Sequence, residues 1–516
     1  MKTFKKIIFF KKYFLVIFLL VFLYSISRIY LRKTSSFGCF DDCFNYTAGW
    51  LILKNKILYK DIFFNHQPLA AYLSALIQAI SHPKTIYELL LVHRNFLIAF
   101  SFIWNILIFK RFNFIGLVFI LCYESIKYYI FGDRFLAEGI IVYPLVYLMG
   151  ICLDGIRLKK ISIIDVIVAP ILSWFVIFMR EPYAPLSFWL YIVIVFLYRN
   201  KDRILFSSLF IFLILSIGIF IFFPITDYLY NVFYINLNSI LIENIANDKL
   251  IIIKILRIIG YPIDIFLEGK ITFLRLHMII LSSIYIYTIC LLFNKNNKFI
   301  FFSIFTFALA NLRPVLPGTM FYEAFHMIPW YGIFLFSTSY FTFVLLSENK
   351  KKVVPIFIGF ILLFLHVFSP KSFIYEKTDR SYEYQINYGN YLVQADIIKT
   401  LSISSDSVFL DGWDEIIYIQ SDRIPKYKYG WYTSMMPHFL KYSEERIKMF
   451  KLSPPEIYYG NCYFGGKLPK FVIDDYVPFY FSNKQTCLHI KRSKLLMIKD
   501  DQWNKIKQYN FYLKSK

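Results

Sequence analysis

The chain is organised around residues 39–80, which read CFDDCFNYTAGWLILKNKILYKDIFFNHQPLAAYLSALIQAI. This stretch follows the first apolar segment and opens with two adjacent carboxylates, Asp41 and Asp42. Two amphipathic runs follow, separated by the polar and aromatic turn of residues 59–68. The pattern predicts a pair of acids at a membrane surface, bracketed by two helices that lie in the interface.

Composition places the chain among membrane proteins. Of its 516 residues, 58% are hydrophobic and 18% are charged, whereas a soluble chain has about 25% charged residues. Each crossing of a bilayer needs roughly 20 mostly apolar residues, although shorter or broken helices are tolerated where they line a cavity inside the protein. The sequence predicts about eleven spans, near residues 13–27, 88–109, 114–131, 137–154, 161–179, 184–198, 204–224, 272–293, 299–311, 326–346 and 353–369.

The basic residues indicate topology rather than a nucleic-acid partner. The formal net charge is +23, but many Lys and Arg residues fall in short clusters between apolar runs, as at 110–111, 157–160 and 350–352. That is the topogenic use of positive charge, so no nucleic-acid partner is expected. With the N-terminus inside, nearly every cluster is cytosolic, which predicts an N-inside, C-outside topology. The first loop, residues 32–87, then lies on the outer face.

The last third of the chain has a different character. Residues 371–516 lack long apolar runs and contain short strand-like pieces, such as 407–410 and 470–473. The region is long enough for one core. We therefore expect a transmembrane domain over 1–370 and a soluble, outer α/β domain over 371–516. A Cys462–Cys487 disulfide is compatible with the outer location, but spacing alone does not establish it.

The acidic pair has two interpretations. One carboxylate could cap a helix that starts near Cys43, but a cap needs only one acid. We expect this helix to lie in the interface on an apolar face made of Phe44, Ala48 and Leu51. Pro68 suits the first position of the second helix. The predicted apolar face of that helix consists of Leu69, Tyr72, Leu73 and Leu76.

Three arginines stand at predicted span ends on the outer side: Arg134, Arg180 and Arg313. Each could be an interface anchor or part of a local ion pair, as for Arg134 and Glu138, which are one helical turn apart. Three on the side that should be poor in positive charge favour contact with a phosphate. His326, near another span end, is by itself more typical of a structural group than of a catalyst.

Several of these motifs resemble the first outer loop of GT-C membrane glycosyltransferases. They are Phe40-Asp41-Asp42 with Tyr46 and Ala48, Leu58-Tyr59-Lys60-Asp61, and His66-Gln67-Pro68-Leu69. Within that superfamily the chain is most similar to the family 39-like proteins, which include protein O-mannosyltransferases and the aminoarabinose transferases that act on lipid A. The segments around Arg134–Glu138, Arg180 and Arg313–Trp330 resemble later outer-face motifs of the same group.

The chain departs from the family pattern at three places. The acidic pair is commonly Asp-Glu and is here Asp-Asp, which keeps two carboxylates. Arg180 stands where a lysine is usual, which keeps the charge but changes the geometry of phosphate binding. Gln67-Pro68 replaces a doubled proline, so the local shape of the loop is expected to differ.

The resemblance implies a fold and an activity. The fold would be an α-helical polytopic GT-C-like membrane protein with about eleven spans and a C-terminal soluble α/β domain. It would transfer a sugar from a polyprenyl-phosphate donor to a hydroxyl of a glycan, lipid or protein acceptor, with inversion, at the outer face of the bacterial inner membrane. Asp41 would be the general base, and Asp42 would orient that base, an acceptor group or a bound cation. The substrate-binding residues would be Tyr59, Asp61, His66, Arg134, Glu138, Arg180, Arg313 and His326.

Other classes of membrane protein remain open at this point. A transporter or flippase should carry ionisable residues at mid-span rather than at the outer ends of spans, where they cluster here. An O-antigen ligase or polymerase depends on a large outer loop late in the chain and needs no acidic first loop. A non-catalytic scaffold would need neither the acids nor the arginines. Asp41 and Asp42 could ligate a divalent cation, but no His/Asp cluster has convincing ligand spacing, so no metal site or certain cofactor is predicted.

Overall fold

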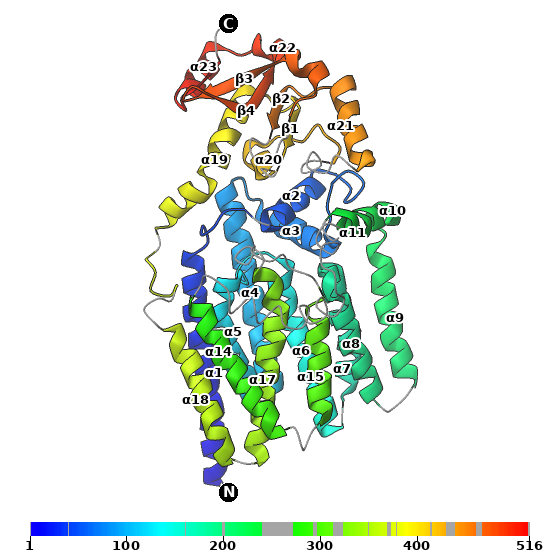
Figure 1. The fold of residues 1–516 in the computed structure, drawn as a ribbon, viewed down its shortest axis with the longest axis vertical. Helices are drawn as coiled ribbons and strands as arrows, with labels where there is room; N and C mark the ends of the chain where they lie inside the picture. The colour runs from blue at the N-terminus through cyan, green and yellow to red at the C-terminus, as the bar shows by residue number, and fades with distance from the viewer. Residues whose placement is uncertain are drawn as a thin grey trace, which may run out of the picture. The chain divides into compact units, whose positions relative to one another are not determined.

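A computed structural model gives the fold of the chain (Figure 1). It describes residues 2–39, 41–159, 161–198, 202–239, 272–292, 297–312, 324–348, 350–368, 373–377, 379–412, 415–429, 439–460 and 467–513.

The chain forms two compact units, and each is built from several separate stretches. Unit 1 consists of residues 1–34, 94–218 and 243–378. Unit 2 consists of residues 35–93, 219–242 and 379–516. The first loop therefore belongs to the same unit as the C-terminal region, and the boundaries of the units do not coincide with the expected division at residue 370.

Unit 1 is a bundle of apolar helices that lie side by side (Figure 1). Its centre is formed by α6 and α17, which pack against each other and are almost entirely buried. Small residues allow the close approach, because a Cβ on Gly332 would lie 2.3 Å from the side chain of Val142. The helices are α1 (Lys2–Arg32), α4 (Ile86–Phe112, whose first residues belong to unit 2), α5 (Phe114–Ile126), α6 (Ala137–Leu158), α7 (Ile163–Met179), α8 (Ala184–Leu197), α9 (Asp202–Ile219), α14 (Thr272–Leu292), α15 (Asn297–Leu309), α17 (Ile328–Glu348) and α18 (Lys350–Val367).

The predicted spans correspond to helices, but not all of these are long. Each predicted segment overlaps one helix of unit 1. Within the described ranges, five helices are long and apolar enough to cross a membrane: α1, α4, α6, α14 and α17. The others are shorter, such as α5 with 13 residues. A multi-pass membrane protein is thus supported, and the count of eleven crossings stays a prediction.

Unit 2 joins the helices of the first loop to a small mixed α/β fold. The sheet has the strand order β1-β2-β4-β3-β5, in which β1 and β2 are parallel and the other pairs are antiparallel. The strands are β1 (Val408–Asp411), β2 (Ile457–Gly460), β3 (Tyr476–Phe481), β4 (Lys484–Lys491) and β5 (Phe511–Leu513). The helical elements are α2 (Asp41–Leu53), α3 (Pro68–Ser81), α10 (Ile225–Tyr228), the π-helix η3 (Leu229–Tyr234), α11 (Ile235–Ser239), α19 (Arg380–Leu401), α20 (Ile416–Ser421), α21 (Leu440–Leu452), α22 (Arg492–Leu495) and α23 (Asp500–Lys507).

One of the two predicted strands is confirmed and the other is wrong. The strand expected at 407–410 is β1. Residues 470–475 instead form a 3-10 helix, η6, directly after Pro469. Of the apolar run Phe471-Val472-Ile473 only Val472 is buried, and Phe471 and Ile473 are both exposed.

Candidate functional site

The acidic pair lies in the first turn of α2, which begins at Asp41. The helix therefore starts two residues earlier than expected, and neither acid occupies the capping position before it. Backbone N–H groups in the first turn of a helix have no partner within the helix, and the dipole favours negative charge there. The start of α2 is a favourable place for two carboxylates.

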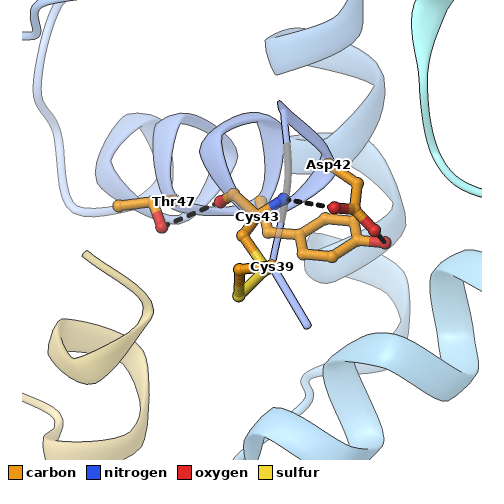
Figure 2. The surroundings of a disulfide bond; sticks show 5 residues. Cys39, Asp42, Cys43 and Thr47 are labelled. Carbon is orange, nitrogen blue, oxygen red and sulfur yellow. Dashed lines mark hydrogen bonds between the residues drawn. A yellow bond between two sulfur atoms is a disulfide. The ribbon is translucent and has the colours of Figure 1, made fainter. Parts of the chain in front are cut away.

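The two acids have different surroundings. Asp42 is fully buried. Its carboxylate accepts a hydrogen bond from the N–H of Cys43 at 3.1 Å, and the hydroxyl of Tyr46, one turn later, lies 3.5 Å away. Figure 2 shows Asp42 on the same turn as the disulfide between Cys39 and Cys43. These contacts anchor Asp42 within its own helix.

Asp41, by contrast, has an accessible side chain that faces His66. The Oδ2 of Asp41 lies 3.5 Å from the Nε2 of His66, and the two side chains are 40% and 14% exposed. The rings of Phe44 and Phe64 contact the imidazole edge-on, with centroids 5.4 and 5.7 Å away. Residues 25 positions apart thus form a carboxylate–imidazole pair that is held by aromatic side chains and open to an incoming group.

Two residues predicted to bind substrate, Tyr59 and Asp61, make hydrogen bonds within the loop before α3. Tyr59 is fully buried, has the left-handed φ of 67°, and donates its hydroxyl to the carbonyl of His66 at 2.8 Å. Asp61 accepts the N–H of Ile57 at 3.0 Å. Both residues therefore shape the loop, and their contact with a substrate stays a prediction.

The apolar face predicted for α2 is not an exposed face, because every residue of α2 from Asp42 to Leu51 is buried. Its neighbours are α3 and α20. Pro68 does stand at the first position of α3, and the buried face of that helix holds mainly small and polar residues, Ala70, Ala71, Ser74, Ala75 and Gln78, together with Ile77. The predicted face is half-buried or exposed.

The disulfide between Cys39 and Cys43 was not predicted. Its Cα atoms are 5.3 Å apart, and the bond encloses both acids. The available signal was a pair of cysteines on either side of Asp41-Asp42 in a loop assigned to the outer face, where disulfides persist. Cys487 is also disulfide-bonded, and Cys462, the partner suggested for it, lies outside the described residues.

A second group of predicted residues meets in unit 1. Glu138 lies in the first turn of α6. Its carboxylate accepts a hydrogen bond from the Nε–H of Arg180 at 2.8 Å and lies 2.8 Å from the Nδ1 of His326. All three side chains are at most 3% exposed. The hydroxyl of Tyr183 donates to the carbonyl of His326. The structure thus gathers Glu138, Arg180 and His326 into one buried cluster.

Of the other two arginines predicted to bind phosphate, the structure describes Arg134 but not Arg313. Arg134 is 1% exposed, and its guanidinium lies 5.5 Å from the ring of Phe131. A fully buried guanidinium is not an interface anchor, because an anchoring Arg keeps its charged head in water. Arg313 lies outside the described residues.

A buried ionic network in unit 1 was largely missed. Glu124 pairs with Lys127 at 2.6 Å and accepts hydrogen bonds from Asn105 and Tyr143 at 2.8 and 2.7 Å. Nearby in the sequence, Asp133 pairs with Arg94 of α4 at 2.9 Å. The signal was the i, i+3 pair Glu124 and Lys127 in an apolar segment. Pairing offsets the cost of burying these charges.

Metal ligands are not gathered anywhere in the described part of the chain. Among those residues, no three His, Cys, Asp or Glu side chains converge as a metal site would require.

Comparison with protein-family models, with curated proteins and with solved structures gives no match. The likeness to GT-C glycosyltransferases therefore rests on the motifs of the sequence.

Proposed function

We propose that this protein is a membrane glycosyltransferase that transfers a sugar from a polyprenyl phosphate to an acceptor hydroxyl. The observation that carries the proposal is the pairing of Asp41 with His66 at the start of α2. An accessible carboxylate beside an imidazole is suited to accept a proton. The apolar helices of unit 1 supply the setting that a lipid-borne donor needs.

The reaction would be a single displacement. The acceptor oxygen forms a bond to the anomeric carbon while its proton passes to the carboxylate of Asp41. The bond between the anomeric carbon and the phosphate oxygen breaks, and the electron pair leaves with the polyprenyl phosphate. Because the phosphate is already a stable anion, no second carboxyl acid is needed, unlike in glycoside hydrolysis. The configuration at the anomeric carbon inverts.

The residues around Asp41 would have supporting roles. His66 would orient the carboxylate, and Asp42, anchored within α2, would hold the first turn that presents it. The assignment of the leaving phosphate to Arg134, Arg180 and Arg313 remains a proposal from the sequence. In unit 1, Arg180 also pairs with Glu138.

The test is transfer by purified protein from labelled polyprenyl-phosphate sugars to a panel of hydroxyl acceptors. Loss of a general base should reduce the rate by about 10²- to 10⁴-fold, so we expect that loss for Asp41→Asn. Asp422→Asn is the matched control, because Asp422 is exposed and its left-handed backbone accommodates Asn. Sugar transfer at the wild-type rate by a correctly inserted Asp41→Asn protein would refute the role of Asp41. The absence of transfer from every donor by the wild type would refute the function.

The buried network around Glu124 favours a second candidate, a lipid-linked substrate transporter or flippase. Ionisable residues between apolar helices mark substrate or ion pathways in transporters. For a transporter, Glu124→Gln should abolish movement of a labelled lipid across sealed vesicles, and no sugar transfer should occur in detergent. For the glycosyltransferase, transfer occurs in detergent and depends on Asp41.

A further inference from the structure

The helical run formed by α10, η3 and α11, residues 225–239, exposes several large apolar side chains. Its exposed side carries Ile225, Leu229, Phe233 and Leu237, which are 50%, 49%, 40% and 56% exposed. Its only charged residue is Asp227, which is paired with Lys441 at 2.7 Å. We call the four exposed residues the apolar stripe.

Three polar residues of the run, Tyr228, Asn231 and Asn236, contact the rest of unit 2. Asn236 exchanges two hydrogen bonds with Asn65, at 2.8 and 3.0 Å. Asn231, fully buried, accepts the hydroxyl of Tyr442 at 2.8 Å. Tyr228 donates to the side chain of Gln67 at 3.0 Å. These three residues bind the run to the rest of unit 2, including both neighbours of His66. Val232 and Ile235 are buried, and the four residues of the apolar stripe stay uncovered.

The π-helical turn keeps the stripe in line. Residues spaced by four drift forward around a helix of 3.6 residues per turn. A π turn uses more residues per turn and offsets that drift. Because η3 covers Leu229–Tyr234, it corrects the middle of the stripe. Four large apolar side chains are thus presented along one side of the run.

Neighbouring parts of unit 2 extend the same kind of surface. Tyr72 of α3 contacts Phe222, with ring centroids 5.6 Å apart, which places α3 beside the start of the run. On α3 the exposed large apolar residues are Leu76 and Ile80, at 56% and 74%. Phe222 itself is 62% exposed. A soluble surface rarely exposes so many large apolar side chains on neighbouring elements.

We propose that the apolar stripe is embedded in the lipid of the bilayer surface, with the run lying parallel to the membrane. Two observations favour lipid over a protein partner. Only five residues separate the run from α9, one of the shorter apolar helices and one of the segments that the sequence predicts to span the membrane. The exposed face also carries no charge and includes Tyr234, an aromatic residue of the type enriched at lipid headgroups.

Site-directed spin labelling in nanodiscs tests the proposal without any activity assay. Single cysteines would replace Leu229, Phe233 and Leu237 in a Cys290→Ser background, because Cys290 is an exposed free thiol. The matched control is Lys448→Cys on α21, whose side chain is 63% exposed and charged. For labels in lipid, collision with oxygen exceeds collision with a water-soluble nickel complex, and at Lys448 the order should be reversed.

Each other outcome overturns the proposal. If the nickel complex dominates at all three stripe positions, the stripe faces water. If both collision rates are low and the labels are immobilised, protein covers the stripe, either a second copy or another part of the chain. The glycosyltransferase proposal is unaffected by either result, because it is measured by sugar transfer.

Discussion

At the scale of single residues, adjacent acids acquire different surroundings because of the helix that carries them. Successive residues on an α-helix point about 100° apart. The side chain of Asp42 is therefore buried, and Cys43 and Tyr46 of the same helix contact it. The side chain of Asp41 points in another direction, where it is 40% exposed and contacts His66. The difference in surroundings is why we assign proton transfer to Asp41 and support to Asp42.

The Cys39–Cys43 disulfide should stabilise unit 2 although its loop is short. Chain entropy for a loop of this size predicts that Cys43→Ser lowers the free energy of unfolding by about 2 kcal/mol. Denaturant unfolding of the wild type and of Cys43→Ser in detergent measures the effect, whereas a reductant would also break the disulfide of Cys487. Cys290→Ser should change nothing, since Cys290 is a free, exposed thiol. An unchanged unfolding midpoint in Cys43→Ser would contradict the prediction.

At the scale of elements, close packing explains why α2 is buried all round. A Cβ on Gly49 would lie 2.7 Å from the backbone nitrogen of Ala75 and 2.8 Å from the hydroxyl of Ser74. The hydroxyl of Ser74 in turn contacts the Nε2 of His93 at 2.8 Å. The two helices therefore cross with their backbones nearly touching, and Leu76 and Ile80 of α3 lie on its exposed side.

Gly49→Ala should destabilise this crossing, because the added methyl group meets backbone atoms that have nowhere to move. Overpacking of this kind costs about 1–3 kcal/mol. Gly218→Ala is the matched control, since a Cβ there has no neighbour within 4 Å in α9 and alanine favours helix by up to about 1 kcal/mol. Thermal unfolding of the two variants in detergent should shift in opposite directions. Equal shifts would argue against the close crossing.

The sheet carries a pH-dependent contribution to stability at His489 of β4. Burial lowers the pKa of His489 below 6.5, although the carbonyl of Cys487 partly opposes the shift. The unfolded chain then binds a proton more readily than the folded chain, so this contribution is complete above pH 6.5 and is lost as the pH falls. We expect His489→Gln to unfold with a flatter pH dependence between about pH 7 and 5. An identical pH profile for both proteins would contradict this expectation.

At the scale of the whole molecule, the chain builds two units from interleaved segments. Unit 1 contains most of the apolar helices, and unit 2 combines the first loop with the C-terminal sheet. Within unit 2 the N–H of Phe63 donates to the carbonyl of Tyr429 at 2.8 Å. A loop of the N-terminal part is thus completed by residues more than 300 positions later.

The predicted topology can be tested through one native thiol. With the N-terminus inside, Cys290 stands near the cytosolic end of α14, and the sheet of unit 2 is outside. In intact cells, a membrane-impermeant maleimide should label a cysteine introduced at Lys448 and leave Cys290 unlabelled until the cells are permeabilised. Labelling of Cys290 in intact cells would reverse the assigned orientation.

The sequence by itself determined what depends on composition and local pattern. Apolar runs predicted the helices of unit 1, and Pro68 predicted the start of α3. A short run with β-branched and aromatic residues predicted β1. These features follow from hydrophobicity and backbone preference. Only the tertiary structure decided which side chains meet. The pairs Asp41–His66 and Glu138–Arg180 join positions far apart in the chain, and the burial of α2 depends on a helix crossing at Gly49. Periodicity shows that a face exists, but what covers that face depends on packing between distant segments.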